Sequence, residues 1–305
     1  MLKVSLMVEG QDGVTWTRWR ELTEAAETLG FTGLYRSDHF TNPEGPVRPA
    51  LELWASLTWL ASHTERITFG PIVSPVSFRD PVVTAWQAVT VNDLSGGRLR
   101  LGLGAGWQER EHRSFGYDLL DLDGRFARFQ EALEVISRLI RRDEPVTFDG
   151  DYYRLENASF AIGRDSAGAP PITIGGNGPT RTLPLVARYA NEWNAVLTTA
   201  ARFTELNGEL DRLAREAGRQ PAEIRRTMMT RVVLARDEAE ARSKLNGRDP
   251  QELRDRGALV GDPETIIQDL GRLRDAGAAE VMLQWLDLDD MAGIEALASE
   301  VLPRL

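Results

Sequence analysis

The sequence contains no cysteine among its 305 residues, and it contains only three histidines. Without cysteine the chain has no disulfide, no thiolate nucleophile and no cysteine-ligated metal. The three histidines, His39, His63 and His112, are too scattered for the usual zinc-binding spacings. We therefore expect no metal site.

A long apolar run and an excess of positive charge are also missing. Residues 1–10 hold one lysine and one glutamate and show neither a signal peptide nor a membrane span. The chain has 36 Lys and Arg against 46 Asp and Glu, a formal net charge of −10, whereas nucleic-acid binding requires a basic surface. We expect a cytoplasmic protein that binds neither nucleic acid nor membrane, with enough apolar residues (42%) for a sizeable core.

What the sequence does contain is a repeated alternation of strand-like and helix-like segments. Apolar residues recur every three or four positions in segments such as 16–29 and 125–141, which predicts helices between the strands. Such alternation favours parallel strands, and eight units fit an α/β fold, a (β/α)8 TIM barrel, in one domain of residues 1–305. The predicted strands are 2–8, 33–36, 67–73, 98–107, 171–174, 192–196, 227–234 and 280–286. The predicted inserted loops are 106–124, 146–169 and 246–261.

Functional groups of a TIM barrel lie at the C-terminal ends of its strands. His39 is either a turn residue bonded to the backbone or a proton donor or acceptor, because imidazole titrates near neutral pH. Asp38 is either a cap or loop acceptor or a part of the site. The rule gathers these residues around one mouth: Glu9, Asp38, His39, Ile72, Val73, Ser74, Gly104, Ala105, Gly106, Trp107, Gly175, Gly176, Asn177, Gly178 and Asn194.

Two glycine-rich stretches indicate where a ligand could approach the backbone. In residues 98–107, Gly102 and Gly104 leave one face of the predicted strand bare, as happens where a ligand or another backbone comes close. Residues 175–178 precede a predicted helix with Arg181 in its first turn, which is either an anion site at a helix N-terminus or an ordinary turn beside a surface arginine. Together the stretches suggest a planar cofactor with a phosphate, rimmed by Trp107, Glu109 and His112. The helical tryptophans Trp54, Trp59 and Trp86 are predicted to be core residues.

The sequence also contains five short motifs. They are Ser-Asp-His-Phe at 37–40, Asp-Leu-Ser-Gly-Gly-Arg at 93–98, Leu-Gly-Leu-Gly-Ala-Gly-Trp at 101–107, Asp-Gly-Asp-Tyr-Tyr at 149–153 and Ile-Gly-Gly-Asn-Gly at 174–178. Together these motifs resemble the bacterial luciferase-like monooxygenase superfamily, and more narrowly its coenzyme F420-dependent oxidoreductases. The resemblance extends over residues 2–305 and implies a TIM barrel, a deazaflavin (F420) or flavin (FMN) at its mouth, frequent homodimers and hydride transfer at C5 of the ring.

The resemblance also implies residue roles. Asp38 and His39 would lie at the edge of the ring, with His39 as acid or base and Glu109 or His112 as helpers. A bulge after the third strand, often with a non-prolyl cis peptide that we place at 71–72 or 72–73, would back the ring. The bulge comprises Pro71, Ile72, Val73 and Ser74, and the phosphate contacts would be Gly106, Gly176, Asn177, Gly178 and Arg181.

The sequence departs from F420-dependent glucose-6-phosphate dehydrogenases at two places. Those enzymes have Glu where this chain has Trp107, and Trp where it has Asn42 and Pro43, which argues against a sugar-phosphate substrate. We expect an F420-dependent oxidoreductase that acts on a small organic molecule entering beside Trp107, beneath loops 41–49 and 146–169. The alternatives are an FMN-dependent monooxygenase served by a separate reductase, and a non-catalytic flavin- or F420-binding protein. The predicted helix at 50–61 is the expected dimer interface.

Overall fold

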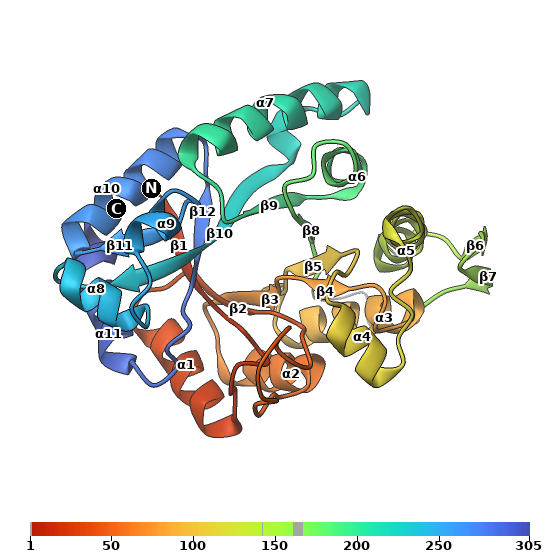
Figure 1. Ribbon diagram of the computed structural model, residues 1–305. Coiled ribbons are helices and arrows are strands. Elements are labelled where there is room, and N and C mark those ends of the chain that lie inside the picture. The colour runs from red at the N-terminus through yellow and green to blue at the C-terminus, as the bar shows by residue number, and fades with distance from the viewer. Residues whose placement is uncertain (1, 142, 161–166) are drawn as a thin grey trace.

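A computed structural model describes residues 2–141, 143–160 and 167–305, so residues 161–166 of the predicted loop 146–169 lie outside the described residues. The chain forms a ring of strands surrounded by helices (Figure 1). The strands are β1 (Lys3–Val8), β2 (Gly33–Arg36), β3 (Thr68–Pro71), β4 (Ser74–Pro75), β5 (Leu101–Gly104), β6 (Val146–Asp149), β7 (Arg154–Ala158), β8 (Ile172–Gly175), β9 (Glu192–Val196), β10 (Arg225–Leu234), β11 (Leu259–Gly261) and β12 (Glu280–Gln284). The α-helices are α1 (Trp16–Thr28), α2 (Leu53–His63), α3 (Pro81–Leu94), α4 (Glu109–Phe115), α5 (Leu122–Arg141), α6 (Thr182–Tyr189), α7 (Ala200–Glu216), α8 (Glu238–Lys244), α9 (Pro250–Arg254), α10 (Pro263–Asp275) and α11 (Met291–Ala296).

The barrel strands follow the order β3-β2-β1-β12-β10-β9-β8-β5-β4, and β11 adds to β10. All of these pairings are parallel. The ring closes at an isolated parallel bridge between Phe69 and Leu99. There the Phe69 N–H donates to Arg98 O (3.2 Å) and the Arg100 N–H donates to Phe69 O (2.8 Å). The predicted TIM barrel is confirmed, with its third strand divided into β3 and β4.

The division of the third strand explains the glycines of the fourth. The Ile72–Val73 peptide, between β3 and β4, is cis, at one of the two positions that the resemblance indicated. A Cβ on Gly102 would lie 2.0 Å from Pro71 O, and one on Gly104 would lie 2.6 Å from Val73 Cγ2. The space beside both glycines is therefore filled by the neighbouring strand, and the expectation that a ligand fills the space at Gly102 is wrong.

Three helices begin at the same dipeptide, Asp-Pro. Asp80, Asp249 and Asp262 are the N-caps of α3, α9 and α10, and each is followed by proline. The aspartate side chain accepts a hydrogen bond from a backbone N–H of the first turn, and proline is well suited to the first helical position because it lacks the N–H that would be unpaired there. These caps fix where α3, α9 and α10 begin.

Side chains inside the barrel form two layers. The lower layer is ionic: Arg225 bridges Glu192 (2.9 Å) and Glu280 (2.7 Å), and the Ser5 hydroxyl donates to Glu280. Burial raises the pKa of Glu192, and Arg225 opposes that rise. The upper layer is apolar and consists of Met7, Tyr35, Ile72, Met229 and Met282. It forms the base on which a site at the C-terminal ends of the strands can be built.

The three predicted insertions contain secondary structure that the sequence analysis missed. The segment 106–124 contains α4, and the segment 246–261 contains α9 and β11. The segment 146–169 contains the antiparallel hairpin β6–β7, which lies outside the ring beyond α5 (Figure 1). The Glu131 carboxylate on α5 holds the hairpin turn by accepting from the N–H groups of Asp151 and Tyr152, both at 2.9 Å.

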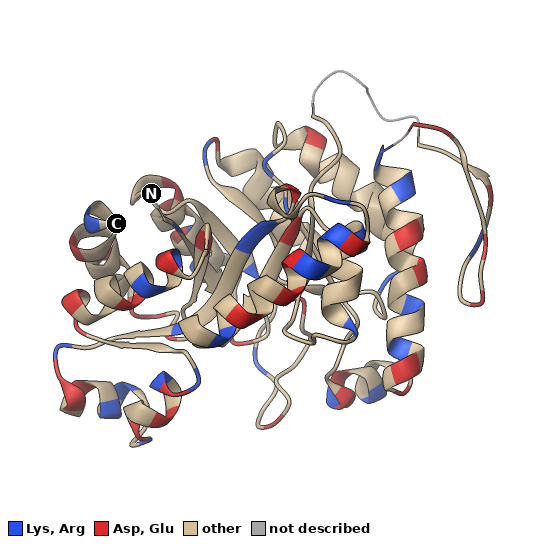
Figure 2. Cartoon of the chain, turned by 90° about the horizontal axis from the view of Figure 1, so that it is seen from above, with Lys and Arg blue, Asp and Glu red and all other residues tan. Residues whose placement is uncertain are grey.

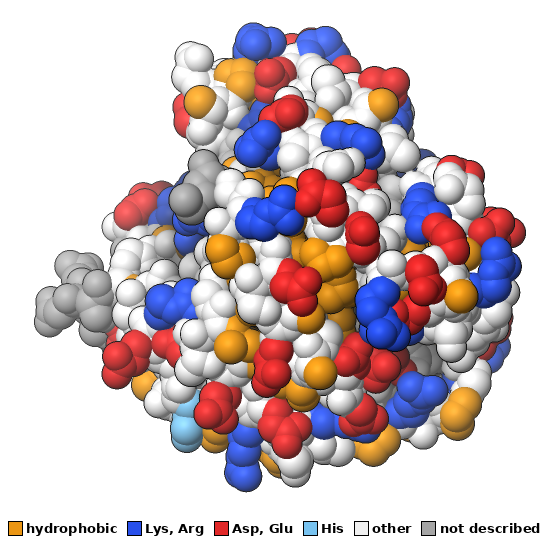
Figure 3. Space-filling model, turned by 90° about the vertical axis from the view of Figure 1, so that its left-hand side faces the viewer, with side chains coloured by type: hydrophobic (Ala, Val, Ile, Leu, Met, Phe, Trp, Pro, Cys, Tyr) orange, Lys and Arg blue, Asp and Glu red, His pale blue; other side chains and the backbone are white. Residues whose placement is uncertain are grey.

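The surface carries both signs of charge. Lys and Arg are interspersed with Asp and Glu along the outer helices (Figure 2) and over the face shown in Figure 3. In the part of the chain that the structure describes, no helix is long and apolar enough to cross a membrane. One predicted core residue is on the surface instead: Trp86 is 56% exposed, whereas Trp54 is buried and Trp59 is partly buried.

Candidate active site

A cavity of about 550 Å³ opens at the C-terminal ends of the barrel strands. It is lined by Met7, Glu9, Ser37, His39, Ile72, Val73, Pro75, Gly104, Ala105, Gly106, Trp107, Glu111, Leu122, Arg125, Phe126, Gly175, Gly176, Asn194, Val196 and Met229. Eleven of the residues predicted at the mouth are among them: Glu9, His39, Ile72, Val73, Gly104, Ala105, Gly106, Trp107, Gly175, Gly176 and Asn194. No residue of the β6–β7 hairpin is among them, so the described part of that insertion does not roof the cavity.

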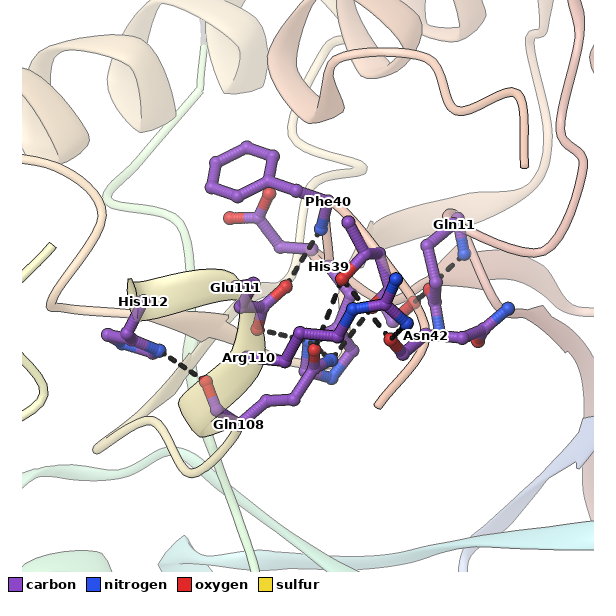
Figure 4. A network of polar contacts seen from close by, with 12 residues as sticks. Gln11, His39, Phe40, Asn42, Gln108, Arg110, Glu111 and His112 are labelled. Atoms are coloured by element: carbon purple, nitrogen blue, oxygen red, sulfur yellow. Dashed lines mark hydrogen bonds and ion pairs between the residues drawn. The ribbon is translucent and has the colours of Figure 1, made fainter. Parts of the chain in front are cut away.

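The central polar pair of the cavity is His39 with Glu111 (Figure 4). Glu111 Oε1 lies 2.7 Å from His39 Nδ1, and Glu111 Oε2 accepts from the Phe40 N–H at 2.9 Å. Because a carboxylate only accepts, His39 Nδ1 carries a hydrogen and the ring turns Nε2 away from the carboxylate. Nε2 has no hydrogen bond to any described residue. The pair thus leaves one nitrogen free for a ligand.

Burial and charge act on His39 in opposite directions. Burial lowers the pKa of His39, but the hydrogen bond and the negative charge of Glu111 outweigh burial and raise that pKa above its ordinary value. The side chain of Glu111 is only 1% exposed and that of His39 is 17% exposed, so water screens this interaction poorly. The contact with Glu111 therefore favours the protonated form of the imidazole.

The predicted helpers Glu109 and His112 lie elsewhere. Glu109 is the exposed first residue of α4 and lies outside the cavity lining. His112 is buried, with Nε2 2.7 Å from Ser77 Oγ and Nδ1 2.7 Å from Gln108 O, so both ring nitrogens have protein partners. Glu111, which the sequence analysis missed, takes the position expected for Glu109. The reason is that 109–115 is a helix, which turns residues two positions apart to different sides.

Helix α4 is itself fixed at both ends. It ends at Gly116, whose φ of 76° places it in the left-handed region that favours glycine. Near its start, Arg110 donates to Asn42 O (3.1 Å) and Gly45 O (2.8 Å), which ties the loop 41–49 to the helix. These contacts hold Glu111 beside His39.

Two aromatic contacts lie near the histidine in the chain or in space. Trp107, which is 58% exposed, lies edge-on to His39 with ring centroids 5.5 Å apart. Phe40 packs against Phe78, with centroids 4.6 Å apart. Trp107 therefore forms the solvent-side wall of the cavity next to the imidazole.

Asp38 does not line the cavity, contrary to its predicted place at the edge of a ring. Its carboxylate is paired with Arg79 and accepts from the Ser74 hydroxyl at 2.7 Å. Burial raises the pKa of Asp38, and Arg79 opposes that rise. Of the predicted bulge, Ile72 and Val73 line the cavity, whereas Pro71 and Ser74 do not. Asp38 and Ser74 thus support the bulge from behind.

The predicted anion site is only partly at the cavity. Gly175 and Gly176 line it, whereas Asn177, Gly178 and Arg181 do not. The Asn177 side chain accepts from the Val196 N–H (2.9 Å) and donates to Val196 O (2.6 Å), so it fastens the loop to β9.

The cation at the cavity comes from another helix. Arg181 is the N-cap of α6 and pairs with Asp123 at 2.6 Å. Arg125 of α5 lines the cavity and donates to Gly106 O (3.2 Å), and it has no ion pair with a described carboxylate. Of these two arginines, Arg125 is therefore the one that can bind a negative group of a ligand in the cavity.

Two further polar residues line the cavity, Glu9 after the end of β1 and Asn194 within β9. Glu9 accepts from Gln284 Nε2 (2.6 Å) and Gln11 Nε2 (3.1 Å), which holds its carboxylate in place. Asn194, on β9, is fully buried. Among the described residues no group of three or more His, Asp or Glu side chains is arranged to hold a metal ion. The groups that the site offers for chemistry are therefore the His39–Glu111 acid–base pair, an apolar wall and the cation of Arg125.

Comparison with known proteins identifies a family to which the sequence is similar. The sequence matches the luciferase-like monooxygenases over residues 3–249. It is 36% identical over 193 residues to the F420-dependent glucose-6-phosphate dehydrogenase of Intrasporangium calvum, an alignment that covers 60% of this chain but only about half (54%) of that protein. A protein of the same name from Amycolatopsis mediterranei is 27% identical in an alignment of 328 positions that covers 94% of each chain.

The fold has a close counterpart among solved structures. An F420-dependent secondary alcohol dehydrogenase in complex with an F420-acetone adduct superposes with a TM-score of 0.87 over 99% of this chain and 98% of that one. The two sequences are 21% identical, so this likeness establishes the fold.

Proposed function

Because the chain belongs to the luciferase-like monooxygenase family, we propose that it is an F420-dependent oxidoreductase that acts on a small organic substrate. The observation that carries the proposal is the His39–Glu111 pair, which presents a free imidazole nitrogen to an apolar cavity at the mouth of the barrel. The relatives named F420-dependent dehydrogenases support the choice of cofactor. When bound, F420 supplies a hydride or accepts one at C5 of its deazaflavin ring.

The residues present fit such a cofactor. A planar ring system needs apolar walls, which Ile72, Val73 and Val196 provide, and close approach to backbone, which Gly175 and Gly176 allow. A phosphate needs a cation, and Arg125 is one that has no carboxylate partner among the described residues. We assign Ile72, Val73, Gly104, Ala105, Gly106, Trp107, Gly175 and Gly176 to the cofactor, with Arg125 and the loop through Asn177 and Gly178 nearest the phosphate.

Residues of the chain itself hold and transfer the proton. Glu111 fixes the hydrogen on His39 Nδ1 and stabilises the positive charge of the imidazolium, so that Nε2 gives a proton to the substrate oxygen or takes one from it. The raised pKa of His39 favours its protonated form, which suits proton donation to a carbonyl oxygen that is being reduced. Trp107 covers the imidazole on the solvent side and limits the access of water.

The substrate that fits is not a sugar phosphate. Apart from His39, the cation at the cavity is Arg125, which we assign to the cofactor. Glu9 adds a negative charge to the cavity lining, and Met7, Met229 and Val196 add apolar side chains to it. A small neutral alcohol or carbonyl compound meets these conditions.

The test compares wild-type protein with His39→Ala. With a panel of small alcohols, F420 reduction is followed by the loss of its visible absorbance. We expect turnover to fall by about 10²–10⁴-fold, the range for a lost general acid or base, while F420 still binds. The control is His63→Ala, an exposed position on α2. Oxygen consumption with reduced FMN, in place of F420 turnover, would favour the monooxygenase, and binding without turnover of any substrate would favour a carrier protein.

We also propose a cytoplasmic homodimer that pairs through the α2–α3 face. On α3, Val83 (46%), Trp86 (56%) and Leu94 (52%) are exposed, and their spacing places them along one side of the helix. A groove of about 410 Å³ beside them is lined by Trp54 and Ala55 of α2. An exposed apolar stripe of this kind is typical of an interaction surface. The predicted interface helix, α2, therefore shares the proposed face with α3.

A further inference from the structure

One hydrogen-bond acceptor in the cavity wall has no donor. Asn194, the third residue of β9, lines the cavity and is 0% exposed. Its Oδ1 atom has no hydrogen-bond partner among the described residues. A buried amide oxygen without a donor is costly, and such groups are uncommon in folded proteins.

The neighbours of Asn194 fix which end of its amide lacks a partner. The Thr227 hydroxyl lies 3.2 Å from Glu192 Oε1 and 3.1 Å from Trp193 O, and both of these atoms can only accept. The hydroxyl hydrogen is therefore used there, and toward Asn194 the hydroxyl acts as an acceptor. Asn194 Nδ2 donates to it at 3.0 Å and also contacts Met282 Sδ at 3.4 Å. The carbonyl end is consequently the one turned away from these partners.

One contact of Asn194 is apolar, that with Met282. Met282 belongs with Met7, Tyr35, Ile72 and Met229 to the upper layer of the barrel interior, and Met7, Ile72 and Met229 of this layer line the cavity. Methionine side chains are flexible and adapt to what lies against them. A ligand that pushes into this layer can therefore reach Oδ1 without disturbing the strands.

We propose that Asn194 Oδ1 accepts a hydrogen bond from an N–H or O–H group at the innermost end of the molecule bound in the cavity. The inference rests on the proposed function, since it assumes that the cavity holds a cofactor ring with its substrate. The donor is either an N–H of the ring or the hydroxyl of the substrate. A buried acceptor discriminates strongly against analogues that lack the donor, because these leave it unpaired.

The experiment uses Asn194→Leu, which keeps the side-chain size and removes the acceptor, and Asn194→Ala as a second variant. Asn207→Leu is the matched control, because Asn207 also has an unpartnered Oδ1 but belongs to α7, outside the cavity lining. F420 dissociation constants are measured by fluorescence titration, and the stability of each free protein by urea unfolding. A wild type that binds FMN instead of F420 would overturn the cofactor assignment but not this inference, which is then tested with FMN.

The expected result is an F420 dissociation constant about 3–10-fold higher in both Asn194 variants, and unchanged in Asn207→Leu, as for the loss of one neutral hydrogen bond. The free Asn194→Leu protein should be as stable as wild type or more so. If the donor is on the substrate, the dissociation constant of F420 stays unchanged in the Asn194 variants, and their KM for the substrate rises with little change in kcat. Two outcomes would overturn the inference. In the first, both F420 binding and KM are unchanged in the Asn194 variants. In the second, the free Asn194→Leu protein is less stable than wild type but has no binding defect.

Discussion

Replacing Glu111 by glutamine tests the acid–base pair without any substrate. Glu111 receives two N–H donors, from His39 Nδ1 and from the Phe40 backbone. Glutamine has one acceptor oxygen and one amide nitrogen, so the Phe40 N–H and the Nδ1–H of a protonated His39 cannot both keep an acceptor. A hydrogen bond to a charged group contributes about 1.5–3 kcal/mol, and in this pair both side chains are largely buried. We expect a loss of that order in the free energy of unfolding.

The pH dependence of the free energy of unfolding tests the pair more specifically than the loss of stability at a single pH. Because the folded state raises the pKa of His39, the pair stabilises the fold fully below the pKa of an unfolded histidine, about 6.5. That stabilisation is lost as the pH rises through the higher pKa of the folded protein. In Glu111→Gln the pKa of His39 falls and this part of the pH dependence disappears.

The assay is an NMR titration of the three histidine rings, assigned by single substitutions, together with urea unfolding across the same pH range. Glu109→Gln is the matched control, two positions earlier on α4 and exposed. It should leave both the His39 titration and the stability unchanged. An unchanged pKa of His39 in Glu111→Gln, or an equal shift in Glu109→Gln, would refute the assignment of the pair.

Four further substitutions test the framework of the fold and the proposed dimer interface. Arg79→Gln leaves the buried Asp38 carboxylate unpaired and should lower the free energy of unfolding by about 3–5 kcal/mol, as measured by urea unfolding. Gly102→Ala places a Cβ 2.0 Å from the backbone of the neighbouring strand and should prevent stable folding, as shown by the loss of a cooperative unfolding transition. Gly208→Ala, in open space on α7, should raise stability by up to about 1 kcal/mol, and an equal effect of both glycine substitutions would contradict the close-approach argument. Trp86→Glu should convert the dimer to a monomer in gel filtration with light scattering, and an unchanged mass would contradict the proposed interface.

The barrel was predictable from the sequence because its signal is distributed over the whole chain. Each parallel strand needs a long crossover, and eight alternations leave few other topologies. The positions of the functional residues at strand ends followed from the same rule. His39, Gly176 and Asn194 were placed at one mouth in this way, although they are distant in the sequence.

Glu111 was not predictable in the same way. The buried side of α4 consists of Glu111 and His112, so the segment shows no apolar periodicity and reads as a polar loop. The one residue in the sequence that indicates this helix is Gly116, which follows its last turn. Gly102 was misassigned for a different reason, since strand parity identifies a bare face but not whether a ligand or a neighbouring strand covers it.

The central claim, that the cavity binds the deazaflavin F420, is tested most directly by equilibrium fluorescence titration of the purified protein with F420 and, separately, with FMN. The apolar walls, the glycines Gly175 and Gly176 and the guanidinium of Arg125 suit either phosphate-bearing ring, and the relatives favour the deazaflavin. We predict saturable binding of F420 with a lower dissociation constant than that of FMN. Tighter binding of FMN, or the absence of saturable binding by both, would contradict the account.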